Sequence, residues 1–243
     1  MSLIKKPVVI FRFVAHEGAG YLGDFLTEQN IAWQLIKVDE GEPLPASILA
    51  YSGMVLMGGP MSVNDDLPWI APILALINAA KNHDIPVLGH CLGGQLMSKA
   101  FGGTITQNDV KEIGWGEVAV SQNVVAKQWF GGLESFNAFH WHGETFSLPQ
   151  GAVHLLKSAH CQNQAWGIDK HLAFQTHIEM TSEMVKKWCD VGVAELAEAS
   201  DSQLSVFKGV QQANQMQENL PVHIYFLQKV ASQVYTQWIK GLV

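Results

Sequence analysis

Cysteine is scarce in this chain, and its three copies are far apart. Cys91, Cys161 and Cys189 form no C-x-x-C pair, and their number is odd. Disulfide frameworks and zinc knuckles need several cysteines at characteristic spacings, so both classes are excluded. A chain of this kind is expected in a reducing compartment.

Charge is sparse as well. Charged residues make up 15% of the 243 residues and hydrophobic residues 48%, a balance that excludes a disordered chain or a coiled coil. The 22 Asp and Glu residues outnumber the 15 Lys and Arg residues, which gives a net charge of −7 without any basic cluster. Nucleic-acid binders carry a basic stripe, so we expect no nucleic-acid partner.

Long hydrophobic runs are missing. The apolar run over residues 7–11 ends at Arg12 and is too short for a secretory signal. The longest apolar helix candidate, residues 69–80, contains Pro72 and is shorter than a membrane span. We therefore expect no membrane segment and a cytoplasmic protein.

The first hundred residues alternate between short β-branched runs and helical patterns. The expected strands are 7–11, 33–38, 53–57 and 85–89, and the expected helices are 21–29, 66 or 67 to 81, and 94–101. This alternation predicts an α/β fold, with a mostly parallel open sheet flanked by helices.

The pattern changes after this first part. Residues 104–173 contain short strand-like pieces and turns, which predict an antiparallel addition to the same sheet. Helical patterns over 181–199, 203–217 and 222–241 predict a helical C-terminal tail, expected to be a packing surface or a dimer face without chemistry of its own. No linker or repeat separates these parts. We expect one domain over 1–243, with a catalytic core over 1–180 and a helical extension over 181–243.

The segment Gly89-x-Cys91-x-Gly93 joins an expected buried strand directly to an expected helix. Glycines on both sides permit the tight turn of a nucleophile elbow, which lifts one side chain clear of the sheet. The turn also places Cys91 at a helix N-terminus, where the helix dipole favours the thiolate. The backbone N–H of Leu92 is then free to face an oxyanion. Cys91 is therefore the candidate nucleophile.

A thiol nucleophile needs a base. His90 is adjacent in sequence, but successive strand residues point to opposite faces, so it is expected to miss the Cys91 sulfur. His177 and Glu179 are two residues apart in a strand-like run and share a face, which would let the carboxylate orient the imidazole. We therefore predict a Cys91, His177 and Glu179 triad.

These residues resemble the class I, or triad-type, glutamine amidotransferases. The similar segments, in the family's order, are Gly58-Gly59-Pro60-Met61-Ser62, Gly89-x-Cys91-x-Gly93-x-Gln95, Phe139-x-x-His142-Gly143-Glu144 and Phe174-x-x-His177-x-Glu179. Glu144 stands where the family usually has Asp. The resemblance covers residues 1 to about 180, and the early segment His16-Glu17-Gly18-Ala19-Gly20 and the helical tail are similar to a stand-alone, glutaminase-like subgroup.

The resemblance implies a flavodoxin-like core and a cysteine-dependent amidohydrolase that acts on glutamine or a γ-glutamyl amide through a thioester on Cys91. It implies an oxyanion hole formed by the N–H groups of Gly59 and Leu92. Gln95 and the segment His140-Trp141-His142 would hold the glutamyl part of a small-molecule substrate. No cofactor is implied.

Several alternatives stay open. His140 and His142 have the i, i+2 spacing of metal ligands, but the sequence offers no third ligand at suitable spacing, so no metal is expected. A γ-glutamyl peptidase is an alternative within the same chemistry. A glutaminase-like subunit or sensor that acts through a partner is another, and a cysteine peptidase or chaperone-like protein with a similar elbow is a third. A homodimer and an ammonia-accepting partner protein are both compatible with the sequence.

Overall fold

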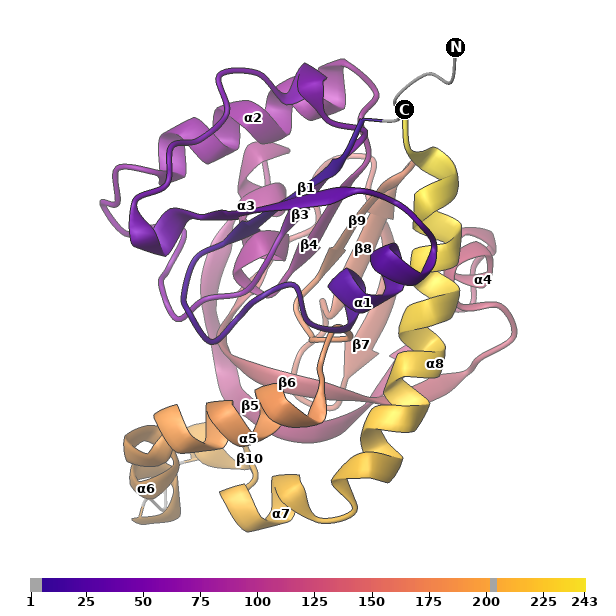
Figure 1. The fold of residues 1–243 in the computed structure, drawn as a ribbon. Coiled ribbons are helices and arrows are strands. Elements are labelled where there is room, and N and C mark those ends of the chain that lie inside the picture. Colours follow the sequence, from indigo (N-terminus) through magenta and orange to yellow (C-terminus); the bar gives the residue numbers. More distant parts are fainter. Residues whose placement is uncertain (1–5, 202–204) are drawn as a thin grey trace.

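A single ten-stranded sheet organises the chain (Figure 1). The structure is a computed structural model and describes residues 6–201 and 205–243. The strands are β1 Val8–Arg12, β2 Trp33–Lys37, β3 Gly53–Leu56, β4 Val87–His90, β5 Ile105–Val120, β6 Ser135–Phe146, β7 Val153–Ser158, β8 Ala165–Ile168, β9 His171–Phe174 and β10 Gly209–Val210.

One half of the sheet is parallel, in the order β2-β1-β3-β4-β9. Every residue of β1, β3, β4 and β9 is buried, which explains why these strands are continuous apolar runs. The order is that of a flavodoxin-like sheet, in which β1 and β3 flank the point where the chain reverses its direction of winding. The predicted mostly parallel α/β sheet is confirmed.

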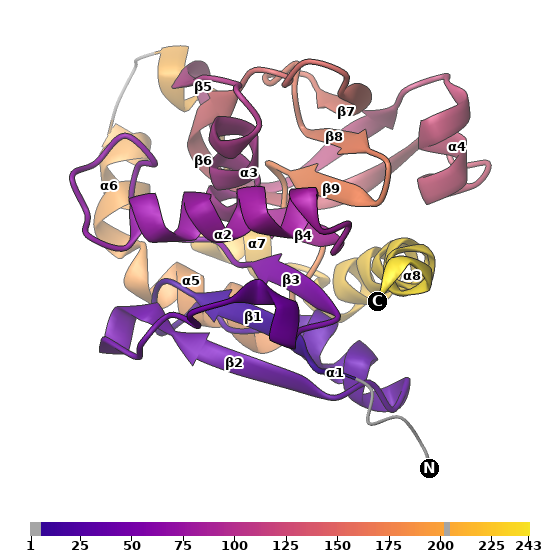
Figure 2. The same cartoon turned by 90° about the horizontal axis from the view of Figure 1, so that it is seen from above.

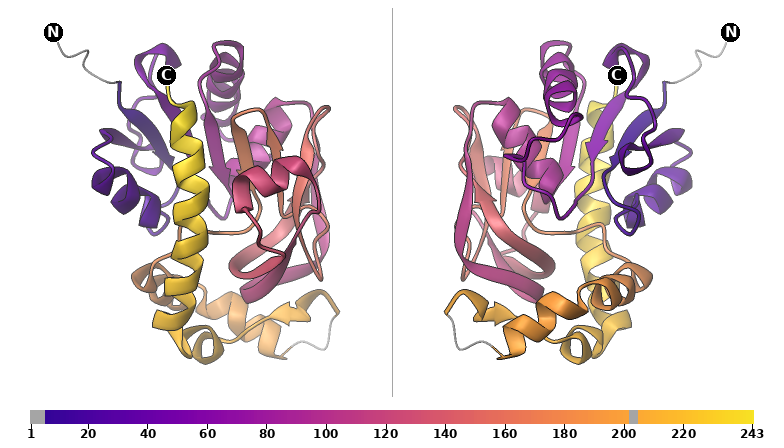
Figure 3. Two further views of the ribbon diagram at one scale, coloured as in Figure 1. Left: turned by 90° about the vertical axis from the view of Figure 1, so that its right-hand side faces the viewer. Right: turned by 90° about the vertical axis from the view of Figure 1, so that its left-hand side faces the viewer.

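The other half is antiparallel. β8 pairs with β9, β7 with β8, and β5 with β7, so the sheet continues past β9 without a gap. β5 and β6 are long and form an antiparallel pair with a register shift between Gln107 and Glu112. In the side views of Figure 3 this pair lies below the parallel strands, next to the C-terminal helices. The predicted antiparallel addition is confirmed.

Helices cover both faces of the parallel half (Figure 2). The helices of the described residues are α1 Gly20–Glu28, α2 Ile70–Asn82, α3 Leu92–Ala100, α4 Val124–Phe130, α5 Ser182–Val191, α6 Val193–Asp201, α7 Ala213–Gln217 and α8 Leu220–Trp238, with 3₁₀ turns at Val38–Glu40, Ile48–Ala50, Ser205–Phe207 and Ile239–Gly241. Alternate residues of β1 enter two separate cores, one shared with α1 and α8 and the other with α2 and α3.

Two expected helices begin elsewhere. α2 starts at Ile70 rather than at 66 or 67, because Pro68 disfavours helical backbone at Leu67. α3 starts at Leu92, two residues before the expected position, because the elbow leads straight into the helix.

The prediction of a helix over 203–217 is wrong in its central part. Residues 203 and 204 lie outside the described residues, and Gly209–Val210 form a short strand that pairs in parallel with Glu112 and Ile113 of β5. A Cβ atom at Gly209 would lie 2.5 Å from the carbonyl oxygen of Lys111, so only glycine permits this close pairing of the strands. Glycine also disfavours a helix, because it loses more backbone entropy than other residues when it becomes ordered. Among the described residues of this stretch, α7 is the only α-helix, and Ser205–Phe207 form a 3₁₀ turn.

The long helix α8 packs against α1, α4 and β6. Leu227, Val234 and Trp238 on its inner face are buried, so its expected role as a packing surface is met. Tyr225 and Phe226 near its beginning are exposed, and a dimer face there stays a prediction. No helix within residues 6–201 and 205–243 combines the length and the apolar character needed to cross a membrane.

Two helix glycines allow α3 to lie directly on the sheet. A Cβ atom at Gly93 would overlap the backbone oxygen of Leu56 in β3, and one at Gly94 would overlap the backbone oxygen of Phe174 in β9. Any side chain at these positions would push the helix, and the elbow before it, away from the strands.

Gly93→Ala should therefore destabilise the protein, although alanine favours a helix by about 1 kcal/mol over glycine. We expect the free energy of unfolding to fall by about 1–3 kcal/mol or more, as for an overpacked core. Urea denaturation of the variant measures this. Gly132→Ala is the control, because a Cβ atom there meets nothing within 4 Å, and equal stabilities of the two variants would contradict the prediction.

Candidate active site

The carboxyl ends of four adjacent parallel strands meet at one edge of the sheet. Glu17 follows β1, Gly58 and Gly59 follow β3, Cys91 follows β4, and His177 follows β9. In open α/β sheets ligands bind outside these carboxyl ends, beside the point where the strand order reverses. The topology therefore gathers most of the candidate residues at this edge.

Cys91 occupies a strained turn between β4 and α3. Its φ of 49° and ψ of −108° are unusual for a residue with a side chain, and such conformations cost about 1–3 kcal/mol. Its N–H donates a hydrogen bond of 2.8 Å to the carbonyl of Phe174 in β9. A Cβ atom at Gly89 would lie 2.5 Å from the carbonyl carbon of Gly93, so the flanking glycines are needed for the turn. The predicted strand, turn and helix are present in this order.

Polar groups surround the Cys91 sulfur. Its thiol lies 3.8 Å from the carbonyl oxygen of Trp141 in β6, and the amide of Gln175 donates to the sulfur at 3.5 Å. The amide of Gln95 donates in turn to Gln175 at 3.2 Å. The side chain of Gln95 thus reaches the nucleophile through Gln175.

His177 and Glu179 form a buried pair. Nδ1 of His177 donates to Oε1 of Glu179 at 2.7 Å, and both side chains are 1% exposed. Nε2 of His177 has no hydrogen-bond partner among the described residues. Burial lowers the pKa of His177, but the charges of Glu179 and Cys91 raise it by more, to well above its usual value. Burial raises the pKa of Glu179, but His90 and His177 bring it down to about 2.

The second oxygen of Glu179 faces His90, at 3.6 Å from Nε2 of that imidazole. The same nitrogen lies 3.3 Å from the hydroxyl of Tyr235 in α8. Burial lowers the pKa of His90, although the charge of Glu179 opposes this shift. His90 therefore contacts the carboxylate of the pair from the opposite side, a contact that sequence spacing did not predict.

The two expected oxyanion donors are backbone amides. Among the described residues, neither the N–H of Gly59 nor that of Leu92 donates a hydrogen bond within the chain. A Cβ atom at Gly59 would lie 2.9 Å from a methyl group of Leu92, so a side chain there would crowd the turn. Of these two residues, Gly59 also lines the cavity described below.

A cavity of about 590 Å³ opens above Cys91. The predicted site residues that line it are Gly59, Cys91, Gln95, Trp141 and His142. His140 does not line this cavity. Its ring lies behind the wall, where Nε2 is 3.4 Å from the carbonyl oxygen of Gly116.

The cavity wall is acidic. It carries the carboxyl groups of Glu17, Asp65, Glu144 and Glu195, whereas Lys111 is its one ammonium group. Lys111 is paired with Glu195 at 2.5 Å, which leaves an excess of carboxylates. Such a wall attracts a ligand that carries a positive charge.

The C-terminal extension lines part of the cavity, a contact that the sequence did not predict. The ring of Trp188 in α5 packs edge-on against His177, with centroids 4.8 Å apart, and its N–H donates to the carbonyl of His16 at 2.9 Å. Glu195 in α6 accepts a 2.9 Å hydrogen bond from the Trp141 ring. An amphipathic pattern in the sequence shows only that a helix packs, not what its buried face contacts.

Glu17 is a buried acid to which sequence reasoning gave no role of its own. Burial, together with the charge of Glu179, raises its pKa to about 7, although His177 opposes the shift. One oxygen has no hydrogen-bond partner among the described residues, and any Cβ atom at Gly58 would overlap it. The sequence offered only an acidic residue in the loop after the first strand, and its proximity to Gly58 is visible only in the structure.

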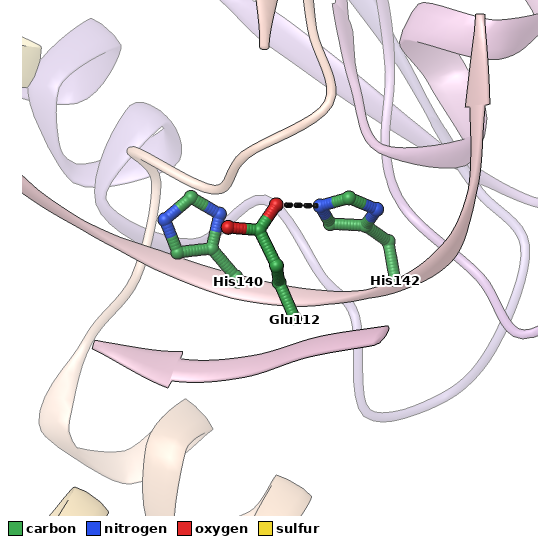
Figure 4. A group of neighbouring side chains, drawn as sticks. All are labelled: Glu112, His140 and His142. Carbon is green, nitrogen blue, oxygen red and sulfur yellow. Dashed lines mark hydrogen bonds and ion pairs between the residues drawn. The ribbon is translucent and has the colours of Figure 1, made fainter. Parts of the chain in front are cut away.

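The expectation that His140 and His142 lack a third metal-ligating neighbour is wrong. Glu112 of β5 lies opposite His142 of β6, and its carboxylate stands between the two imidazoles (Figure 4). Because the register of the β5 and β6 pair shifts between Gln107 and Glu112, the sequence does not predict that Glu112 lies opposite His142.

A cysteine elbow beside a buried His and Glu pair, on a flavodoxin-like sheet, defines a class of α/β protein with a candidate thiol nucleophile. Within that class, the sequence model of the class I glutamine amidotransferases matches residues 25–188. The chain belongs to this family.

Similar proteins agree with this assignment. The chain is 29% identical to the glutamine amidotransferase-like protein YfeJ of Salmonella typhimurium, over 77% of this chain and 82% of that protein. It is 26% identical to gamma-glutamyl peptidase 3 of Arabidopsis thaliana, over 71% and 74% of the two chains.

Solved structures match over nearly the whole chain. A glutamine amidotransferase from Methylobacillus flagellatus is 45% identical, with a TM-score of 0.94 and coverage of 98% of this chain and 96% of that one. A glutamine amidotransferase from Thermotoga maritima is 25% identical, with a TM-score of 0.85 and coverage of 96% and 97%. The sheet and its helices are thus the fold of this family.

Glu17→Gln should change how stability depends on pH. The pKa of Glu17 is about 7 in the folded chain and ordinarily 4.5, so between these values the folded chain keeps a proton that the unfolded chain has released. The free energy of unfolding of the wild type therefore decreases as the pH rises from 4.5 to about 7. The variant lacks this titrating group, so its free energy of unfolding should not show this decrease. We expect the variant's advantage to reach about 3 kcal/mol above pH 7.

Urea denaturation of both proteins at several pH values between 4 and 8 measures this difference. Glu28→Gln, at an exposed position of α1, is the control and should give parallel profiles. A stability difference between Glu17→Gln and wild type that is equal at pH 5 and pH 8 would contradict the prediction.

Proposed function

We propose that the protein is a cysteine-dependent amidohydrolase that cleaves the γ-carboxamide of glutamine, or a γ-glutamyl amide, through a thioester on Cys91. The observation that carries this proposal is the placement of Cys91 on a strained elbow next to the buried pair of His177 and Glu179. The unpartnered Nε2 of His177 supports a role as the proton acceptor for the thiol.

In the first half-reaction, the Cys91 sulfur attacks the carbonyl carbon while its proton moves to Nε2 of His177. The carbonyl oxygen becomes an oxyanion, for which the free N–H groups of Gly59 and Leu92 are the proposed donors. Collapse of this intermediate breaks the carbon–nitrogen bond. His177 gives its proton to the leaving ammonia or amine, and a thioester on Cys91 remains.

In the second half-reaction, water attacks the thioester and gives a proton to His177. The carbon–sulfur bond breaks, the glutamyl carboxylate leaves, and the sulfur recovers the proton. Glu179 keeps the imidazole in the tautomer that presents Nε2 to the sulfur and stabilises its cation. The raised pKa of His177 fits a group that holds this proton in both halves.

The glutamyl part of the substrate is proposed to lie against Gln95, Trp141 and His142. Its α-ammonium group fits the acidic wall formed by Glu17 and the neighbouring carboxylates. His140, which does not line the cavity, would act only through the strand that it shares with Trp141 and His142.

The size of the cavity favours the γ-glutamyl peptidase alternative. A volume of about 590 Å³ lies within the range of about 300–1,000 Å³ in which pockets enclose drug-sized ligands. Free glutamine is smaller than such ligands, so the cavity has room for an amine or a peptide beyond the scissile bond. The similarity to gamma-glutamyl peptidase 3 points in the same direction.

Incubation of the purified protein with glutamine, glutathione and other γ-glutamyl amides separates these functions. Released glutamate, ammonia or amine is measured for each substrate. We expect turnover of at least one γ-glutamyl compound, with an amine product if the peptidase alternative is right. No turnover of any substrate, with a partner-dependent signal instead, would favour the subunit or sensor alternative.

Cys91 should be the thiol that reacts with a diazo-ketone analogue of glutamine. Cys91 lines the cavity, whereas Cys161 and Cys189 do not, and burial raises the pKa of both of these thiols, so they should not react. Peptide mass mapping locates the adduct. An adduct on Cys161 or Cys189 would overturn the assignment of the nucleophile.

The three triad residues should contribute unequally. Cys91→Ala removes the bond-forming atom and His177→Ala removes proton transfer, so both should reduce turnover to background. Glu179→Gln should keep residual activity, with a loss of about 10²–10⁴-fold. The double variant Cys91→Ala/Glu179→Gln should be no worse than Cys91→Ala, because the residues act as one unit. Near-normal turnover of Glu179→Gln would reduce that residue to a bystander.

A further inference from the structure

A buried group of three potential metal ligands lies behind the cavity wall. Glu112 comes from β5, and His140 and His142 come from one face of β6 (Figure 4). Their exposed fractions are 5%, 2% and 6%, and one donor atom of each lies within 4.8 Å of the donor atoms of the other two. None of the three is needed for the proposed proton transfers.

One ring nitrogen of each histidine faces a backbone carbonyl oxygen, and the other ring nitrogen is directed toward Glu112. Nδ1 of His142 lies 2.9 Å from the carbonyl oxygen of Glu144, which can only accept, so this nitrogen carries the proton. Nε2 of His140 faces the carbonyl oxygen of Gly116 at 3.4 Å in the same way. In neutral rings, the lone pairs are then on Nε2 of His142 and Nδ1 of His140.

Both lone pairs face the carboxylate of Glu112. Nε2 of His142 is 3.1 Å from Oε2, and Nδ1 of His140 is buried without a hydrogen-bond partner among the described residues (Figure 4). The amide nitrogen of Gln164 donates to the same Oε2 at 2.7 Å, and it is 3.3 Å from Nε2 of His142. With both rings neutral, only the Gln164 amide donates into this group, an arrangement that is costly unless a proton on His142 or a metal cation balances Glu112.

We propose that Glu112, His140 and His142 bind a divalent transition-metal ion with the ligand preference of zinc. Two imidazole nitrogens and one carboxylate oxygen are a ligand set of that ion. Histidines that ligate metals commonly donate their other ring N–H to a carbonyl or carboxylate, as both do here.

The surroundings supply a fourth position and a path of entry. Oε1 of Gln164 is buried and has no partner in the described chain, and a half-turn of its amide places this oxygen where Nε2 now lies. His142 also lines the cavity above Cys91, so the route of an ion to the group would run past its ring.

Such an ion would act by position and not as part of the reaction. Trp141 lies between the two histidines, and its carbonyl oxygen is 3.8 Å from the Cys91 sulfur. A bound ion would fix this segment of β6 and, with it, the wall that faces the nucleophile.

Binding is tested on the full-length chain carrying Cys91→Ala, because a thiol beside His177 also attracts zinc. After treatment with a chelator, this protein is titrated with Zn²⁺ by calorimetry and with Co²⁺ by visible absorption. We expect one equivalent of either ion per chain, with Zn²⁺ displacing Co²⁺. Absence of saturable binding would overturn the proposal.

Glu112→Gln and His142→Asn, each added to Cys91→Ala, should weaken binding by about 100-fold or more, since each removes a ligand. His83→Asn, at an exposed position after α2, is the control and should bind as the parent does. Circular dichroism reports whether each variant folds. Unchanged affinity in a folded Glu112→Gln variant would show that the ion binds elsewhere and would overturn the proposal.

A second measurement does not depend on the folding of any ligand variant. X-ray absorption of the Zn²⁺ complex of Cys91→Ala should show nitrogen and oxygen ligands with the outer-shell signal of two imidazoles. A sulfur ligand, or a shell without imidazole, would place the ion elsewhere and reject the site.

Discussion

The parallel pairing of β4 with β9 is the constraint on which the candidate site depends. It lets the N–H of Cys91 bond to Phe174, and it brings the two chain segments that follow these strands to one edge of the sheet. Gly94 is needed for the same reason, since a side chain there would separate α3 from β9. Residues 86 positions apart in the sequence, Cys91 and His177, therefore meet because two buried strands are neighbours.

The pKa values of the acids at this edge of the sheet depend on how the C-terminal helices exclude water from it. Trp188 from the C-terminal extension covers His177, and Tyr235 from α8 closes the far side of the Glu179 pocket. Without water, a carboxylate keeps its charge only beside a partner, as Glu179 does, and otherwise holds its proton more tightly, as Glu17 does. Two acids of the same type, in one enclosed region, thus have pKa values on opposite sides of the ordinary one.

The antiparallel half has a comparable influence on the cavity. β6 supplies Trp141 and His142 to the wall, and the partner strand β5 places Glu112 directly behind it. The buried histidine cluster follows from this pair of strands, and β6 also adds Glu144 to the acidic wall. The other three acids of the wall, Glu17, Asp65 and Glu195, come from the parallel half and from α6.

The sequence by itself determined the parallel strands, the elbow at Cys91 and the candidate pair of His177 and Glu179, because each depends on neighbours within a few residues. Continuous apolar runs and glycines at fixed offsets are local signals. The strand at residues 209–210, the burial of Glu17, the contact of Trp188 with His177 and the meeting of Glu112 with His140 and His142 were decided only by the tertiary structure. Each joins segments far apart in the chain, through a register shift or a packing face that no local pattern encodes.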